Sequence, residues 1–405
     1  MGIGGKRFEQ ALAGLTDMSA GAIPIGRDEF MARIARAQAA MRANAIDALW
    51  LNAGTNLFYF TGMRWHPSER MVGAILPANG ALSYLAPAFE EGTLLDYMQV
   101  EGPIHTWQEH ESPYALFAER VAQLTDAPRI GIDESTPFFI ANGMRQAAPT
   151  LDLVDAKVVT AYCRARKSPA EIALMQRAKD MTMAVHIATA SILREGITTV
   201  EVADFIDRAH RKVGAPAGSY FCIVLFGAAT AFPHGVSYVQ TLKPGDTVLI
   251  DTGCKLHHYI SDITRTYVFG TPSERQRHFW NLEKAAQQAA FDAAQLGVPC
   301  EQVDAAARRA LAAAGLGPEY QLPGLPHRTG HGIGLDIHEW PYLVGGDTTP
   351  LDMGMCFSNE PMICVPGEFG IRHEDHFYMT QDGPRWFTQP AHSIDDPFGL
   401  ETGGR

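Results

Sequence analysis

Four carboxylate side chains stand inside apolar, strand-like runs in the C-terminal half of the chain. Asp251 closes the run DTVLIDTG, Asp262 opens DITRTYVFG, Glu360 lies in MCFSNEPMICV, and Glu374 lies in FGIRHEDHFYMT. An unpaired carboxylate in apolar surroundings costs several kcal/mol or takes up a proton. Because carboxylates placed together also repel one another, the fold must supply a cation to them, and a metal ion meets that need.

The chain from Asp251 to Asp262 is typical of one β-hairpin, because the turn-prone stretch KLHH separates two strand-like runs. Opposite ends of antiparallel strands lie about 5 Å apart, so the two carboxylates can meet across the ladder. A pair of solvated turn aspartates is the alternative interpretation. The apolar run before Asp251 disfavours it, and Thr264, Arg265 and Thr266 stand where they can orient Asp262.

A glycine-rich segment, LPHRTGHGIGLDIHEWP, places His327, His331 and His338 close together. A single buried histidine is more often a hydrogen-bonded core residue, but three in one segment indicate a metal or catalytic site. Arg372 stands two positions before Glu374 and therefore on the same face of a strand. A surface ion pair between these two residues is the alternative to a metal site there.

Four carboxylates and one imidazole form an oxygen-rich ligand set that suits Mn²⁺, Fe²⁺, Co²⁺ or Zn²⁺. A single ion would not use all of them. Two ions about 3.5–4 Å apart, bridged by carboxylates and a water, would engage the whole set and lower the pKa of that water. The candidate metal ligands are therefore Asp251, Asp262, Glu360, Glu374 and one of the three clustered histidines.

The bulk properties limit the remaining possibilities. At 405 residues the chain exceeds the usual size of one core, so two domains are expected. The net charge of −12 disfavours nucleic acid as a partner. Six cysteines without CxxC spacing favour a cytoplasmic location, and no apolar run is long enough to span a bilayer. The start, MGIGGKRFEQALAGL, lacks a signal-peptide core and is expected to be unstructured.

Helix and strand signals are mixed along the chain. Ser168, Pro169 and Glu171 mark the start of a long helix, where we place the domain boundary. Before it, the pattern predicts a helix over 27–44, strands at 47–52 and 56–62, and a turn at Asn79-Gly80. After it, helices are expected at 199–213, 273–296 and 300–314, and strands at 220–226, 246–251 and 262–269.

The order and surroundings of the five predicted ligands closely resemble those of the creatinase/methionine aminopeptidase superfamily of "pita-bread" metallopeptidases, family M24. The resemblance covers residues 25–390 and is carried by DTGCKLHHYISDITRTYVFG, HRTGHGIGLDIHEWP, SNEPMICVPGEFGIRHEDHFYMT and RKSPAEIALMQRA. These motifs are most similar to the Xaa-Pro branch, which contains prolidase and aminopeptidase P. The implied fold class is α+β, with a C-terminal pita-bread catalytic domain after a smaller α/β creatinase-like N-terminal domain.

The resemblance also implies a division of the chain and an assembly. An N-terminal extension, 1–24, precedes the creatinase-like domain at 25–160, and the catalytic domain at 161–395 is followed by a tail at 396–405. Members of the superfamily commonly assemble through the N-terminal domain. A homodimer is therefore expected.

Carried over position by position, the resemblance implies roles for the site residues. Asp251 chelates one ion, His331 and Glu360 hold the other, and Asp262 and Glu374 bridge the two. A metal-bridging hydroxide attacks the scissile carbonyl of an Xaa-Pro dipeptide, while Glu360 handles the proton. Four further active-site residues are implied, namely His234 in LFGAATAFPHG, His327, His338 and Arg372.

The implied cofactor is a pair of divalent ions, Mn²⁺ in the first place, with Zn²⁺, Co²⁺ and Fe²⁺ as alternatives. Aminopeptidase P, which acts on longer peptides, shares all five ligands and is the nearest alternative function. A non-peptidase member of the superfamily, either a creatinase-like hydrolase or a lyase, is a second alternative. A pseudo-enzyme that binds peptides without cleaving them is a third. The presence of all five ligands disfavours the pseudo-enzyme and metal-free creatinase-type catalysis.

Overall fold

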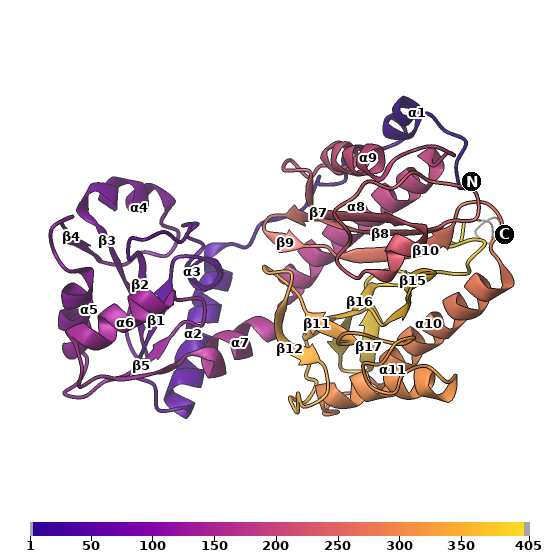
Figure 1. Ribbon diagram of the computed structural model, residues 1–405. Coiled ribbons are helices and arrows are strands. Elements are labelled where there is room, and N and C mark those ends of the chain that lie inside the picture. Colours follow the sequence, from indigo (N-terminus) through magenta and orange to yellow (C-terminus); the bar gives the residue numbers. More distant parts are fainter. Residues whose placement is uncertain (1–2, 401–405) are drawn as a thin grey trace. The chain divides into compact units, whose positions relative to one another are not determined.

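The computed structural model describes residues 3–400, which fall into two compact units (Figure 1). Pro24–Arg164 form the N-terminal unit. The chain before and after this segment forms the second unit, called here the C-terminal unit. Over residues 3–400, no helix is both long enough and apolar enough to cross a membrane.

A mixed six-stranded sheet forms the centre of the N-terminal unit, in the order β4-β3-β2-β1-β5-β6. Trp50 and Phe117 pack edge to face in its core, with ring centroids 5.8 Å apart. The strands are β1 (Ala48–Asn52), β2 (Gly73–Pro77), β3 (Ser83–Pro87), β4 (Ile104–Trp107), β5 (Arg129–Ile132) and β6 (Asp152–Asp155). The helices are α2 (Arg27–Ala43), α3 (Thr55–Thr61), η1 (Ala88–Glu90), α4 (Glu91–Tyr97), α5 (Pro113–Ala122), α6 (Phe138–Ala147) and α7 (Lys157–Ala165).

Most element predictions for this unit are confirmed. Helix α2 occupies the predicted helix at 27–44, and β1 occupies the predicted strand at 47–52. The predicted Asn79-Gly80 turn lies between β2 and β3, which pair antiparallel. Gly80 has a φ of 98°, a conformation that glycine adopts without the steric penalty that other residues carry.

The strand predicted at 56–62 is wrong, because Thr55–Thr61 form helix α3. Leu57 and Phe60, three positions apart, are both fully buried, as the inner face of a helix requires. Gly62 ends the helix in the left-handed conformation, with a φ of 72°. Tertiary packing of this helical face overrides the strand preference of its aromatic side chains.

Two sheets form the body of the C-terminal unit. The first has the order β10-β8-β7, with β9 paired to β8, and the second has the order β12-β11-β13-β16-β17. Helices α8 and α9 pack on the first sheet, and α10 and α11 pack together beside the second, so that the sheets lie between two helix pairs (Figure 1). An isolated β-bridge between Thr264 and Glu374 connects the two sheets.

The bounds of these elements follow the predicted pattern closely. Ser168 caps α8 by accepting from the Glu171 N–H, and the Glu171 side chain accepts from the Ser168 N–H at 2.9 Å, as predicted. The helices are α1 (Phe8–Ala13), α8 (Pro169–Ile192), α9 (Thr199–Lys212), η2 (Gly227–Ala231), α10 (Glu274–Ala293) and α11 (Cys300–Ala313). The strands are β7 (Ser219–Phe226), β8 (Thr247–Leu256), β9 (Tyr259–Ile260), β10 (Ile263–Val268), β11 (Gly330–Gly332), β12 (Glu339–Leu343), β13 (Cys356–Asn359), β14 (Met362–Val365), β15 (Phe369–Arg372), β16 (Asp375–Thr380) and β17 (Gly383–Trp386).

Helix α1 lies in the N-terminal stretch that was expected to be unstructured, so that expectation is wrong for the described residues from 3 onward. Helix α1 packs on α8 and α9, with Ala11 buried in their common core. The rings of Phe8 and Phe205 lie 5.3 Å apart, and the N–H of Gly4 donates to the Ala190 carbonyl at 2.8 Å. The apolar face of this short helix covers the core of the C-terminal unit, which explains why it is ordered.

The end of the chain also packs on this unit. The ring of Phe398 lies 5.9 Å from that of Tyr267, and residues 395–400 line a cavity of about 400 Å³ together with residues of the N-terminal segment and α8. The predicted tail at 396–405 therefore begins in a packed region. Its last five residues, 401–405, lie outside the described residues.

His210 gives the C-terminal unit a pH-dependent stability. Its ring is fully buried, with Nε2 3.0 Å from the Thr182 hydroxyl and Nδ1 2.9 Å from the Ser219 hydroxyl. Burial lowers the pKa of His210 from 6.5 to about 4. Because the folded pKa lies below the unfolded one, the unfolded chain binds the proton first, and stability is lost as the pH falls from 6.5 towards 4.

We expect a His210→Leu variant to lose less stability than the wild type over this pH range. The variant lacks the part of the pH dependence that comes from His210. That part is roughly 3 kcal/mol in the free energy of unfolding, because the unfolded and folded pKa values of His210 differ by about 2.5. Urea unfolding of metal-free protein at about pH 7 and about pH 4.5 measures the free energy of unfolding of both proteins. Equal pH dependence in variant and wild type would show that His210 titrates normally.

Candidate metal centre

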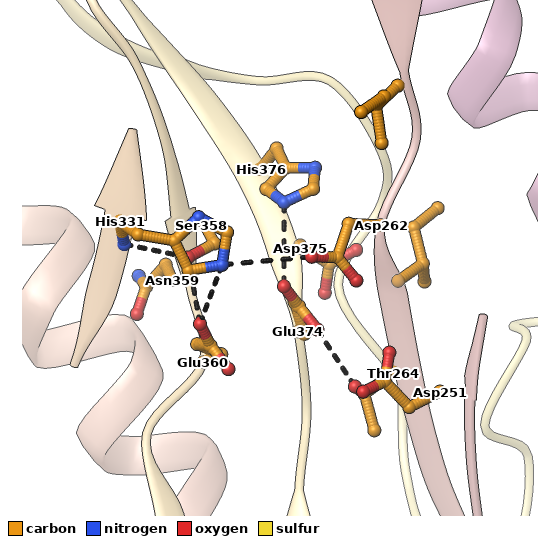
Figure 2. A network of polar contacts seen from close by, with 12 residues as sticks. Asp251, Asp262, Thr264, His331, Ser358, Asn359, Glu360, Glu374, Asp375 and His376 are labelled. Atoms are coloured by element: carbon orange, nitrogen blue, oxygen red, sulfur yellow. Dashed lines mark hydrogen bonds and ion pairs between the residues drawn. The ribbon is translucent and has the colours of Figure 1, made fainter. Parts of the chain in front are cut away.

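The carboxylates of Asp251 and Asp262 meet where the two sheets come together (Figure 2). Asp251 stands within β8, between β7 and β10, and Asp262 directly precedes β10. Asp251 lies opposite Thr264 in the antiparallel register, and Asp262, two positions before Thr264, shares its face of the sheet. The predicted hairpin pairing is confirmed, and both carboxylates are buried.

His331 and Glu360 face each other from β11 and the end of β13. The Nε2 atom of His331 lies 3.0 Å from Oε1 of Glu360 and 3.7 Å from Oδ2 of Asp262. On the other side of the ring, Nδ1 lies 3.0 Å from the Gly332 carbonyl, which accepts a hydrogen bond only from a protonated nitrogen. In the neutral ring, Nε2 therefore directs its lone pair at two carboxylates, the orientation that a metal ligand requires.

Glu374 lies between β15 and β16 and is 1% exposed. The Thr264 hydroxyl donates to its Oε2 at 2.8 Å, across the bridge between the two sheets. Its Oε1 has no hydrogen-bond partner among residues 3–400 and lies 3.5 Å from Nε2 of His376 (Figure 2). One oxygen of Glu374 is thus held by the protein, and the other is available to a cation.

Arg372 is a buried cation beside these carboxylates. Its Nη2 donates to Asp251 at 2.6 Å, its Nε donates to the Thr264 hydroxyl at 3.1 Å, and its Nη1 donates to the Pro233 carbonyl at 3.2 Å. A surface ion pair between Arg372 and Glu374, the alternative weighed for these residues, is contradicted. Both side chains are buried, and the guanidinium donates to Asp251.

The electrostatics of the cluster favour a bound cation. Burial raises the pKa of Asp251, Asp262 and Glu374 above their usual range, and neighbouring carboxylates raise those of Asp262 and Glu374 further. Burial also opposes ionisation of Glu360, but a proton on Nε2 of His331, which a bound metal ion would replace, hydrogen-bonds to Glu360 and holds the pKa of that carboxyl below its usual value. Three carboxylates that resist ionisation in isolation would ionise readily with positive charge between them.

The cluster fits divalent metal ions on structural grounds. Oδ1 of Asp251 and Oε1 of Glu374 are buried without a hydrogen-bond partner in the described part of the chain. Two sets of ligand atoms lie within 4.8 Å of one another, His331 with Glu360 and Glu374, and Asp262 with Glu374 and His376. Oxygen-rich sets with imidazole suit Mn²⁺, Fe²⁺, Co²⁺ and Zn²⁺.

The other predicted active-site histidines surround this cluster. The ring of His338 lies 4.3 Å from that of His331 and is exposed. Nδ1 of His327 donates to the Arg328 carbonyl at 2.7 Å, and its ring lies within the electrostatic reach of Glu360. His234 is exposed and follows Pro233, whose carbonyl Arg372 binds. The structure places all nine predicted site residues in or beside the cluster, namely Asp251, Asp262, His331, Glu360, Glu374, His234, His327, His338 and Arg372.

The residues after Asp262 have a different task from the one expected. Thr264 donates to Glu374 instead of orienting Asp262. The fully buried guanidinium of Arg265 pairs with Asp375 at 2.7 Å. Thr266 donates to the Arg372 carbonyl. Together they hold the 372–375 segment of the second sheet in place against the first.

Sequence reasoning missed His376. It stands two positions after Glu374, and the two-residue period of a strand places both side chains on one face. The two-residue spacing that placed Arg372 on the same face as Glu374 would have predicted the same for His376. The structure places its ring next to the Glu374 carboxylate (Figure 2).

A buried carboxylate and histidine cluster between two helix-covered sheets is the arrangement of a metal-dependent hydrolase domain. Comparison with known families agrees. The profile of metallopeptidase family M24 matches residues 173–381, and that of the creatinase/prolidase N-terminal domain matches residues 33–166. The chain belongs to metallopeptidase family M24, whose members depend on metal, which confirms the predicted family and the α+β pita-bread fold class.

Individual relatives are similar over most of their length. A putative dipeptidase of Bacillus subtilis, YkvY, is 32% identical over 362 residues, which cover 89% of this chain and 98% of the relative. The crystal structure of dipeptidase PepE from Mycobacterium ulcerans superposes with a TM-score of 0.85 at 33% identity, covering 92% and 99% of the two chains. A recombinant prolidase from Thermococcus sibiricus superposes with a TM-score of 0.80 at 30% identity, covering 89% and 97%.

We expect metal to stabilise the C-terminal unit, because an ion removes the repulsion among its buried carboxylates. A ligand present at 100 times its Kd adds about 2.7 kcal/mol to the free energy of unfolding. Calorimetric melting of metal-stripped protein with and without Mn²⁺ measures the shift in Tm. An Asp262→Asn variant is the control, and its Tm should respond much less to Mn²⁺. An equal response of both proteins would place the ion elsewhere.

Proposed function

We propose that the protein is a dinuclear-metal Xaa-Pro dipeptidase. The observation that carries this proposal is the convergence of Asp251, Asp262, His331, Glu360 and Glu374 in one buried cluster. A likeness to proteins called dipeptidase and prolidase, each about as long as this chain, supports the substrate class.

The five residues divide between two ions in this proposal. Asp251 would hold one ion, His331 and Glu360 would hold the other, and Asp262 and Glu374 would be shared between them. Divalent ions at such a site supply Lewis acidity and lower the pKa of a coordinated water towards neutrality. Arg372 keeps Asp251 in position, since its guanidinium donates to that carboxylate at 2.6 Å.

Glu360 is the proton carrier of the proposed reaction. Its side chain is 14% exposed, more than the other carboxylates of the cluster, and Oε1 is fixed by the Ser358 hydroxyl at 3.1 Å and by His331 at 3.0 Å. It takes the proton from the attacking water and delivers it to the leaving nitrogen. That nitrogen must gain a proton before it can leave, because an amine is a far better leaving group than an amide anion, and in an Xaa-Pro bond it belongs to a tertiary amide without an N–H.

The exposed histidines serve the substrate. His338 and His234 border the cluster from segments outside the two sheets. In this proposal their N–H groups donate to the scissile carbonyl oxygen as it gains negative charge, which stabilises the tetrahedral intermediate. His327 is less exposed than these two histidines, and its Nδ1 donates to the Arg328 carbonyl at 2.7 Å. In this proposal it is a positioning residue that does not touch the substrate.

We expect the purified protein, stripped of metal and reloaded with Mn²⁺, to release proline from Ala-Pro. The same preparation should act much more slowly on Ala-Pro-Ala and on Ala-Ala, and metal-stripped protein should be inactive on all three. Free proline and free alanine are quantified by chromatography. A metal-free burst of activity would exclude the proposed chemistry.

The three peptides separate the alternative functions. Release of alanine from Ala-Pro-Ala at a rate comparable with Ala-Pro would identify an aminopeptidase P type of enzyme. Equal rates on Ala-Ala and Ala-Pro would identify a dipeptidase without proline preference. Absence of cleavage of all three peptides, with metal bound, would refute the Xaa-Pro function.

We expect His338→Ala to lower kcat by roughly 10²-fold while metal content stays at the wild-type level, because the proposed partner of His338 is the transition state. Steady-state kinetics on Ala-Pro and metal analysis by mass spectrometry measure the two quantities. His392→Ala, which removes an exposed histidine from the segment after β17, is the control and should retain wild-type kcat. Loss of metal from His338→Ala would instead make His338 a ligand.

A further inference from the structure

His376 is a fully buried histidine on β16 to which the proposed mechanism gives no role. β16 runs antiparallel to β13, and the register places His376 opposite Ser358. Opposite residues of a strand pair share one face of the sheet. Because the Ser358 hydroxyl contacts both Glu360 and the His331 N–H, the His376 ring lies on the side of the sheet that carries the metal-ligand candidates (Figure 2).

Neither ring nitrogen of His376 has a hydrogen-bond partner among residues 3–400. A buried polar atom without a hydrogen-bond partner has lost its contact with water without compensation, which destabilises the fold. His210 in the same unit avoids this cost by hydrogen bonding to two hydroxyls. Nε2 of His376 faces Oε1 of Glu374, a buried oxygen that also lacks a partner. Two ligand atoms therefore point at each other in the interior without a hydrogen bond between them.

The distance between these two atoms fits a shared ion better than a hydrogen bond. They lie 3.5 Å apart, whereas N–H···O bonds span about 2.7–3.2 Å. Ligand atoms about 2.1 Å from one ion lie about 3 Å apart when adjacent and about 4.2 Å apart when opposite. Asp262, Glu374 and His376 each offer a ligand atom within 4.8 Å of the others, as a common ion requires.

An ion pair between a charged His376 and Glu374 is the competing account. A charge-assisted N–H···O bond spans about 2.7–2.9 Å, and the two atoms lie 3.5 Å apart. The other ring nitrogen, Nδ1, also lacks a hydrogen-bond partner among residues 3–400. The geometry therefore favours an imidazole that uses one nitrogen to bind a metal.

We propose that His376 is an additional protein ligand of the metal centre, binding through Nε2 the ion held between Asp262 and Glu374. This inference rests on the proposed function, because it requires the metal centre to exist. A second imidazole adds nitrogen to an oxygen-rich set without adding charge. It therefore raises the affinity for Co²⁺ and Zn²⁺ more than the affinity for Mn²⁺.

Proton NMR of the Co²⁺-loaded protein tests the proposal on the unmodified chain. The imidazole N–H proton of each cobalt-bound histidine is shifted far outside the ordinary range and can be counted. We expect two such resonances in the wild type, one from His331 and one from His376. This count does not depend on activity or on the folding of any variant.

Two variants assign the resonances and measure the contribution of the new ligand. We expect His376→Leu to lose one resonance and to bind one of its Co²⁺ ions at least about tenfold more weakly in calorimetric titration. Affinity for Mn²⁺ should fall by a smaller factor. His210→Leu, which also removes a fully buried imidazole from this unit, is the matched control and should keep both resonances. Far-UV circular dichroism checks the fold of each variant.

The outcomes separate this inference from the proposed function. A single resonance in the wild type that disappears in His331→Leu would overturn the role of His376 and leave the dinuclear centre intact. Absence of both Co²⁺ binding and shifted resonances would overturn the metal centre itself. If His376→Leu does not fold, the number of resonances in the wild type still decides.

Discussion

Repulsion among buried carboxylates is the constraint on which the C-terminal unit depends. Asp251, Asp262 and Glu374 are brought together at the junction of two sheets, where each is less than a tenth exposed. Arg372 contacts Asp251 directly, but one guanidinium does not neutralise three carboxylates. A bound metal ion would complete the charge balance, and metal binding would then be linked to the folding of this unit.

The strands give the metal centre its rigidity. The buried ion pair of Arg265 and Asp375 and the hydrogen bond from Thr264 to Glu374 fasten the two sheets to each other beside the ligands. Asp251 and His331 lie within strands, and the other three candidate ligands lie directly next to strand ends. Side chains held by strands keep their geometry better than side chains on loops. His234 and His338, in contrast, lie on exposed segments outside the sheets. The candidate ligands are thus held at buried strands and strand ends, whereas His234 and His338 are accessible to solvent, as the proposed substrate-binding role requires.

The ligand set was predictable because each member is anomalous in its local surroundings. A carboxylate such as Glu360 in an apolar run has to be compensated, and this can be recognised without a structure. The α8 start was predictable for a similar reason, since the Ser168 and Glu171 capping box is a local interaction. Segments without such local signals were harder. The aromatic run of α3 and the apolar face of α1 take their structure from the elements on which they pack.

By itself, the sequence determined which side chains need a cation and most of the helices and strands, α1 and α3 excepted, because burial cost, capping and two-residue periodicity act over short stretches of chain. Only the tertiary structure decided what each group contacts. Thr264 was expected to orient Asp262 but donates to Glu374, and Arg372 was weighed as a partner of Glu374 but donates to Asp251. The packing of one sheet against the other sets these pairings, since residues more than a hundred positions apart meet only there.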